Sequence, residues 1–217
     1  MQYRNREEAA ELLVEKLADF KGKNPLILAI PRGAAPMAKL IAAELGGEVD
    51  VVLVRKLGAP GNPEFAIGSV DETGWTYVAD YAGSVGGTKD YLAAEKERQL
   101  ETMRKRRAQY TPVRPPIDPA GRIVIVVDDG LATGATMISA LHAIRAKNPE
   151  LLICAVPVAP PDTINKVAHY ADQVICLQTP VNFQAVGQFY LEFSQVSDAE
   201  VVEVLRESAA GRGQTLP

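Results

Sequence analysis

Ile123-Val124-Ile125-Val126-Val127-Asp128-Asp129-Gly130-Leu131-Ala132-Thr133-Gly134-Ala135-Thr136 is the most informative stretch of the sequence. Its first five residues are β-branched and apolar, which is typical of a strand buried on both faces of a parallel sheet. Two carboxylates follow, and then a loop of small and hydroxyl-bearing residues that leads into a helical segment. In an open α/β sheet, ligands bind beyond the carboxyl ends of the strands. The stretch therefore predicts a ligand site at the end of this strand.

The polar residues of this stretch suit a ribose that carries a phosphate. Asp128 and Asp129 can accept hydrogen bonds from two neighbouring sugar hydroxyls. The following loop precedes a helix N-terminus, where free N–H groups and the helix dipole favour an anion. Its glycine permits close backbone approach, and its threonines add donors. The loop residues are Ala132, Thr133, Gly134, Ala135 and Thr136. No Walker lysine and no G-x-G-x-x-G pattern is present, and a plain strand–turn–helix with an aspartate cap is the structural alternative.

The rest of the chain alternates short apolar runs with helical patterns, which predicts an α/β three-layer sandwich with a mainly parallel sheet. The expected strands cover 26–30, 49–54, 123–127, 151–158 and 174–177, and the expected helices cover 35–45, 135–147 and 162–169. A lead-in helix is expected within 1–22. We interpret residues 1–217 as a single domain.

Residues 56–120 are expected to form an insertion in this pattern. A Gly/Pro-rich stretch over 57–63 precedes a predicted β-hairpin with strands at 64–70 and 75–79. A long charged helix is expected over 89–110. Its basic cluster at 104–107 is interleaved with acidic residues on the same helix, so a solvated face is a better interpretation than a nucleic-acid site.

Composition narrows the functional class. The chain has 217 residues, with 23 Lys and Arg against 27 Asp and Glu, for a formal charge of −4. Its apolar runs are far shorter than the roughly 20 residues of a membrane span, and its N-terminus has no apolar signal core. Cys154 and Cys176 are expected to be buried strand thiols, because two cysteines make neither a disulfide framework nor a zinc site. We expect a cytoplasmic protein that binds neither membranes nor nucleic acid.

Residues 126–136 resemble the phosphoribosyl pyrophosphate (PRPP) signature of the type I phosphoribosyltransferases. That signature is a strand, two acidic residues, a short spacer and a T-G-x-T-like phosphate loop. The resemblance implies the fold of that family over residues 20–195. It also implies that Asp128 and Asp129 hold the ribose 2′- and 3′-hydroxyls, and that the loop from Ala132 to Thr136 holds the 5′-phosphate.

Two further segments are similar to pyrophosphate-binding parts of the family. Arg32 and Gly33 follow the first core strand, where the family has a loop that often contains a cis peptide; here the matching bond is Pro31–Arg32. Arg55 and Lys56 end the next expected strand and resemble the Arg-Lys pair of adenine and orotate phosphoribosyltransferases. The Gly/Pro-rich stretch after them would be the mobile catalytic loop. Taken alone, these cations could equally be ordinary surface residues.

The segment 179–197 resembles the hood that covers the acceptor base in hypoxanthine-guanine phosphoribosyltransferases. The resemblance implies acceptor binding by Phe183, Val186 and Phe189, although packing of a terminal loop onto the sheet explains each aromatic ring as well. The whole chain is similar to a group of bacterial phosphoribosyltransferase-like proteins that share the Pro-Arg-Gly loop and the Ala-Val-Gly-Gln hood. The resemblance to that group does not imply any particular acceptor.

The resemblance implies a pentosyltransferase of nucleotide metabolism that moves ribosyl 5-phosphate from PRPP to a nitrogen acceptor and releases pyrophosphate. Asp128, Asp129, Arg32 and Lys56 are the expected catalytic residues. Mg²⁺ is the expected cofactor, carried by PRPP and reached by Asp128 or Asp129 through water, and a homodimer is expected. The alternative is a non-catalytic PRPP-binding regulator on the same fold. An unrelated hydrolase or kinase is disfavoured, because no nucleophile elbow or Walker lysine is present.

Overall fold

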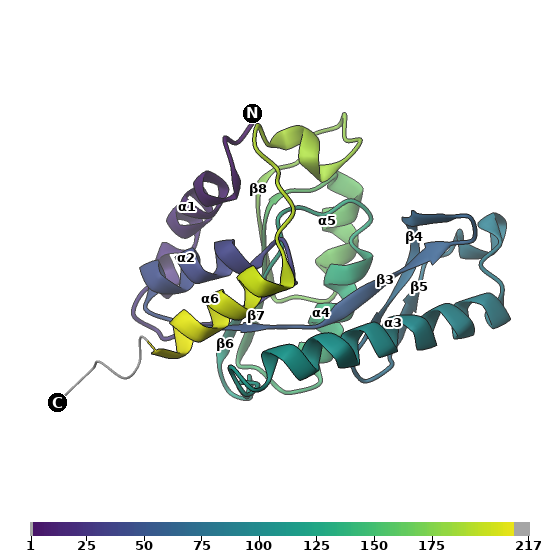
Figure 1. Cartoon of the computed structure of the whole chain (residues 1–217). Helices are drawn as coiled ribbons and strands as arrows, with labels where there is room; N and C mark the ends of the chain where they lie inside the picture. The colour runs from purple at the N-terminus through teal and green to yellow at the C-terminus, as the bar shows by residue number, and fades with distance from the viewer. Residues whose placement is uncertain (1, 211–217) are drawn as a thin grey trace.

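The computed structural model describes residues 2–210 (Figure 1). Its main sheet has five strands in the order β2-β1-β6-β7-β8, and every neighbouring pair is parallel. The strands are β1 (Leu26–Ala29), β2 (Glu48–Val51), β6 (Ile123–Val127), β7 (Leu151–Val158) and β8 (Gln173–Gln178). The prediction of a mainly parallel sheet is therefore confirmed.

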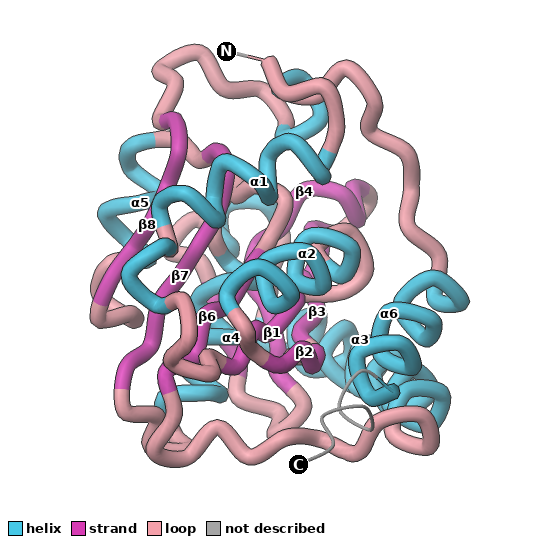
Figure 2. The backbone as a smooth tube through the Cα atoms, turned by 90° about the vertical axis from the view of Figure 1, so that its left-hand side faces the viewer, coloured by secondary structure: helices cyan, strands magenta, loops and turns pink. Residues whose placement is uncertain are grey.

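Helices cover both faces of this sheet, which confirms the three-layer sandwich. Side chains of β6 alternate between two cores: Ile125 and Val127 face one, and Val124 and Val126 face the other. Each of these buried side chains contributes about 1.5–3 kcal/mol of hydrophobic burial, so β6 has to lie in the middle of the sheet. The first core is closed by α1 (Arg6–Lys16) and α2 (Ala35–Leu45), and the second by α4 (Ala135–Arg145) and α5 (Pro161–Val167). Figure 2 shows α1 and α2 in front of the strands.

A second, antiparallel sheet corrects part of the sequence analysis. It contains β3 (Val54–Ala59), β4 (Asn62–Asp71) and β5 (Thr76–Val78). The strand expected over 49–54 is divided between the two sheets, because β2 ends at Val51 and β3 begins at Val54. Arg55 and Lys56 therefore lie inside β3, not at the end of a parallel strand.

The stretch 57–63 is also not an open loop. Ala59 pairs with Asn62 across a two-residue turn at Pro60-Gly61, so proline and glycine mark a tight turn between two strands. Whether this hairpin moves stays a prediction. The hairpin expected farther along is confirmed by the antiparallel pairing of β4 with β5.

Two more helices complete the fold. The long helix α3 (Lys89–Tyr110) has the predicted bounds and extends with the second sheet to the right of the parallel sheet in Figure 1. The helix α6 (Asp198–Ala210) was not predicted, and residues 211–217 lie outside the described residues. Short 3₁₀ turns span Ala18–Phe20, Ala82–Val85 and Val186–Phe189. Within residues 2–210, no helix has the length and apolar character that would span a membrane.

The N-terminus and the hood lie side by side at the carboxyl end of the parallel sheet. The Tyr3 N–H donates to the Phe189 carbonyl at 2.7 Å, and the Leu191 N–H donates to the Tyr3 carbonyl at 2.8 Å. The Tyr190 hydroxyl donates to the Asp129 carbonyl at 2.7 Å, which ties the hood to the residues after β6. These bonds place both segments over the predicted ligand site.

Candidate active site

The loop between β6 and α4 has free donors. Within the described chain, the backbone N–H groups of Ala132, Thr133 and Gly134 donate to no backbone or side-chain acceptor. The loop is held from behind, because the Thr163 hydroxyl donates to the Ala132 carbonyl at 2.7 Å. Gly134 precedes the first residue of α4 with a φ of 78°, which a glycine adopts without strain. A braced loop with unpaired N–H groups at a helix N-terminus is suited to a phosphate.

This loop forms one wall of a cavity of about 430 Å³. Lys56 and Val186 also line this cavity, so the structure brings together three groups of residues that the sequence analysis selected. The rest of the lining includes residues of the β3–β4 hairpin and the hood, namely Glu64, Phe65, Ala66 and Gln184. The Lys56 ammonium lies 2.6 Å from the Glu64 carboxylate and keeps the pKa of Glu64 below its usual range.

Asp128 and Asp129 follow β6 directly and immediately precede the residues of the cavity wall. The Asp129 N–H donates to the Asp128 carboxylate at 2.9 Å. Burial of the Asp128 carboxyl raises its pKa well above its ordinary value, and the negative charge of Asp129 raises it further. An acid pair in such a position gains stability when hydroxyl donors or a cation reach its charge.

Arg6 of α1 holds the second acid, and the sequence analysis missed it. Its Nε and Nη2 lie 2.9 and 2.8 Å from the same carboxylate oxygen of Asp129. Arg6 also donates to the Ser194 carbonyl at 2.7 Å, and its guanidinium lies 4.0 Å from the centre of the Phe193 ring. Burial raises the pKa of Asp129, and the charge of Arg6 opposes that rise. A single arginine in an amphipathic helix carries no motif that would have identified it.

Gly33 approaches Asp129 more closely than any other residue type could. A Cβ atom at this position would lie 2.2 Å from the Asp129 carboxylate oxygen. The preceding Pro31–Arg32 peptide bond is cis, as the sequence analysis expected. The loop after β1 and the acid pair after β6 therefore form a single packed unit.

Comparison with known proteins identifies the family of this chain. A model of the phosphoribosyl transferase domain matches residues 3–194. The chain belongs to the phosphoribosyltransferase family. It is 41% identical over 204 residues to two Mycobacterium tuberculosis proteins, "Putative phosphoribosyl transferase Rv0571c" of strain H37Rv and its counterpart MT0597 of strain CDC 1551. The match covers 93% of this chain and 46% of each relative, so the chain spans about half the length of those proteins.

A solved structure shows the same fold. The chain is 44% identical to TT1426 from Thermus thermophilus, with a TM-score of 0.79 over 95% of this chain and 99% of that one. The fold of this chain therefore has an experimental counterpart.

Two of the selected arginines lie outside the residues that line the 430 Å³ cavity. Nη1 of Arg32 is 3.5 Å from the Asp198 carboxylate at the start of α6, and Nε of Arg55 donates to the Gln99 side chain at 2.8 Å. Arg32, Arg55 and Lys56 therefore do not converge on one point in this structure.

The hood places its rings differently from the expectation. Phe183 and Phe189 stack on each other, with centroids 5.4 Å apart, and Phe189 is buried in the core. Val186 is thus the hood residue of the expected three that lines the cavity. Phe65 of β4 also lines it and is 42% exposed, which makes its ring available to a ligand. From the sequence, Phe65 was expected only as part of a hairpin strand.

Proposed function

We propose that this phosphoribosyltransferase transfers the 5-phosphoribosyl group of PRPP to a nitrogen acceptor and releases pyrophosphate. The observation that carries the proposal is the unpaired N–H loop beside two adjacent carboxylates at the end of β6. In the reaction, the bond between the anomeric carbon and the pyrophosphate oxygen breaks, and its electron pair leaves with pyrophosphate. The acceptor nitrogen forms the new bond to carbon, and its surplus proton passes to solvent.

Each group of site residues would bind the part of the substrates that its charge suits. The loop at 132–136 would bind the 5′-phosphate through its N–H groups. Asp128 and Asp129 would orient the ribose hydroxyls, and their negative charge would favour the cationic character of the sugar ring in the transition state. Lys56 also lines the cavity, and its ammonium would leave the Glu64 carboxylate to pair with a substrate phosphate instead. Holding both substrates in one cavity would supply several kcal/mol through proximity alone.

The residues fit a Mg²⁺ ion that arrives with its substrate. Among residues 2–210, no group of three or more His, Cys, Asp or Glu side chains could hold a metal ion. Mg²⁺ at phosphate sites usually keeps waters and takes only one or two carboxylates. Burial raises the pKa of both Asp128 and Asp129, so a nearby cation would favour their ionised forms. When bound, the ion would neutralise charge on the departing pyrophosphate.

Phe65→Ala should raise the KM for the acceptor about tenfold and change the KM for PRPP little. A ring that stacks on a heterocycle contributes about 0.5–1.5 kcal/mol beyond its buried area, and its loss removes that contact from the acceptor alone. Initial rates at varied acceptor and at varied PRPP separate the two constants. Equal increases in both KM values would place Phe65 outside the acceptor site.

Incubation of the protein with PRPP, Mg²⁺ and a panel of nucleobases and related heterocycles should release pyrophosphate with one acceptor. Mass spectrometry of the mixture should then show the corresponding nucleotide.

Arg32→Ala should abolish pyrophosphate release while the circular dichroism spectrum stays unchanged, because the departing pyrophosphate loses the guanidinium that would bind it. Binding of PRPP without turnover of any acceptor would instead support the regulator. The expected homodimer stays a prediction, which analytical ultracentrifugation of the protein would test.

A further inference from the structure

Three arginines from distant segments gather near the start of α6. We call Arg32, Arg55 and Arg106 the arginine cluster; they come from the loop after β1, from β3 and from α3. Nε of Arg106 lies 3.3 Å from one carboxylate oxygen of Asp198, and Nη1 of Arg32 lies 3.5 Å from the other. One carboxylate therefore sits between two guanidinium groups, in the manner of a bound anion.

Arg106 departs from the solvated face expected for its helix. Its side chain is 14% exposed, against 66% for Arg104 and 71% for Lys105 in the same basic run. The next residue, Arg107, also points inward and pairs with Glu72. The basic run is thus divided into an outer pair and an inner pair, and Arg106 belongs to the inner one.

The positive charge of the arginine cluster exceeds what Asp198 neutralises. Burial lowers the pKa of Arg55, and the charges of Arg106 and Arg32 lower it further, so the three guanidinium groups repel one another. Glu95 is the other acid that acts on Arg55, and it is already paired with Arg98 at 2.5 Å. A ligand with more negative charge than a single carboxylate would therefore be favoured here.

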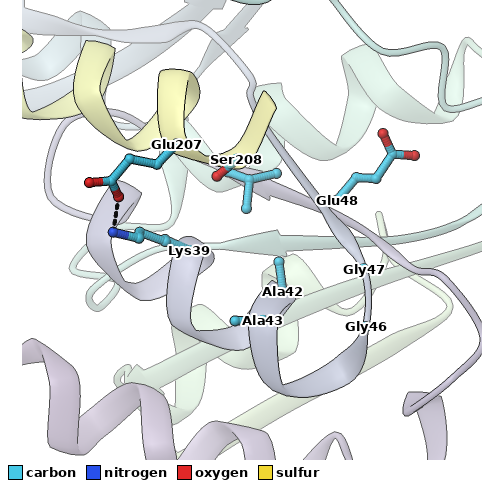
Figure 3. A pocket seen from close by; sticks show the side chains of 9 residues that line it. Lys39, Ala42, Ala43, Gly46, Gly47, Glu48, Glu207 and Ser208 are labelled. Carbon is cyan, nitrogen blue, oxygen red and sulfur yellow. Dashed lines mark hydrogen bonds and ion pairs between the residues drawn. The ribbon is translucent and has the colours of Figure 1, made fainter. Parts of the chain in front are cut away.

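The helix that carries Asp198 is held in place without it. Val201 and Leu205 are fully buried against the core shared with α1 and α2. Toward the other end of α6, Glu207 pairs with Lys39 of α2, and both residues line a cavity of about 330 Å³ (Figure 3). Releasing the Asp198 carboxylate consequently leaves α6 docked.

We propose that Arg106 is a further residue of the diphosphate subsite, and that Asp198 occupies this subsite in the free protein until the diphosphate displaces it. The inference rests on the proposed function, since Arg32 is its link to the leaving group. Tyr110 extends the subsite: its hydroxyl donates to the Asp198 carboxylate at 2.5 Å. The same hydroxyl can donate to a phosphate oxygen, because burial raises the pKa of Tyr110 and keeps it protonated.

The test is titration calorimetry of the full chain with inorganic pyrophosphate and Mg²⁺. Arg106→Gln should weaken binding about tenfold or more, since a charge-assisted hydrogen bond is lost, and Arg106→Lys should recover part of it. Asp198→Asn should tighten binding about threefold to tenfold, because the competing charge is removed while the side chain can still accept from Tyr110. Arg104→Gln, an exposed arginine of the same helix, is the matched control and should bind as the unmodified chain does.

Each outcome decides a separate claim. No pyrophosphate binding, unchanged binding in Arg106→Gln, or weaker binding in Asp198→Asn with an unchanged unfolding temperature would overturn the inference. Nucleotide formation from PRPP together with any of these results would leave the proposed function intact. Conversely, the expected pyrophosphate responses without turnover of any acceptor would support the subsite and refute the transferase activity.

Discussion

Asp128→Asn is expected to weaken PRPP binding roughly 10- to 100-fold and to raise the midpoint of thermal unfolding, whereas Asp129→Asn should lower both affinity and stability. The loss of affinity follows from the loss of a charged acceptor for a ribose hydroxyl, which contributes about 1.5–3 kcal/mol. The stability of Asp128→Asn should rise because burial and the neighbouring acid make the ionised carboxylate unfavourable. Each kcal/mol recovered corresponds to about 2–4 °C for a chain of this size.

The opposite effect at Asp129 comes from Arg6. The side chains of this ion pair are 12% and 14% exposed, so Asp129→Asn leaves a poorly hydrated guanidinium without its carboxylate. Breaking a buried pair on one side costs about 3 kcal/mol or more. The unfolding midpoint should therefore fall by roughly 6–12 °C. Two adjacent aspartates that we propose to bind the same ribose are thus expected to have opposite effects on stability.

Calorimetry with PRPP and Mg²⁺, combined with thermal unfolding followed by circular dichroism, checks both parts. The pH dependence is an internal control. Because the pKa of Asp128 is raised in the folded state, its destabilising effect is present at neutral pH and disappears as pH falls through that raised value. The stability advantage of Asp128→Asn should shrink in acid. Equal unfolding midpoints for the two variants at pH 7 would mean that the ion pair of Arg6 with Asp129 does not stabilise the fold.

Gly33→Ala should reduce PRPP binding as strongly as loss of an acid, although no polar group is removed. The added methyl would lie 2.2 Å from an Asp129 oxygen that Arg6 holds, and 3.4 Å from Nη2 of Arg6 itself, so either the acid or the loop after β1 must shift. Overpacking of this kind costs about 1–3 kcal/mol of stability. A displacement of the acid from the ribose hydroxyls also removes their hydrogen bonds.

Gly83→Ala is the matched control for this substitution. A Cβ at Gly83 would meet no atom within 4 Å, so the change tests only the general effect of replacing glycine. Calorimetry and unfolding of the two variants should show a loss in Gly33→Ala alone. Native-like affinity in Gly33→Ala would mean that the loop after β1 yields easily and does not position the acid.

The sequence predicted the parts of the site that are local. The strand Ile123–Val127, the acid pair and the loop before Ala135 are contiguous, and each has a pattern with one good structural interpretation. The loop at Arg32 was found for the same reason. The division of the run 49–54 between two sheets was missed, because no glycine or proline separates Val51 from Val54.

The partners of the site residues could not be predicted, because they are set by tertiary packing. Arg6 lies 123 positions before Asp129, and nothing in an amphipathic helix indicates which of its charges will face a buried acid. Asp198 begins a helix whose pattern was not recognised, so its contact with Arg106 was equally hidden. In both cases an aspartate pairs with an arginine that is distant in sequence, and the pair is defined only by the folded structure.

The pairing of Tyr3 with the hood has a practical consequence for how the protein is produced and purified. Residues ahead of α1 do more than lead into the domain, since their backbone bonds fix the segment to which Tyr190 and Ser194 belong. Trimming the first five residues, or crowding them with an affinity tag, would therefore disturb the hood and, through it, the surroundings of Asp129. Activity assays on protein purified through an N-terminal tag are therefore best repeated after the tag has been removed.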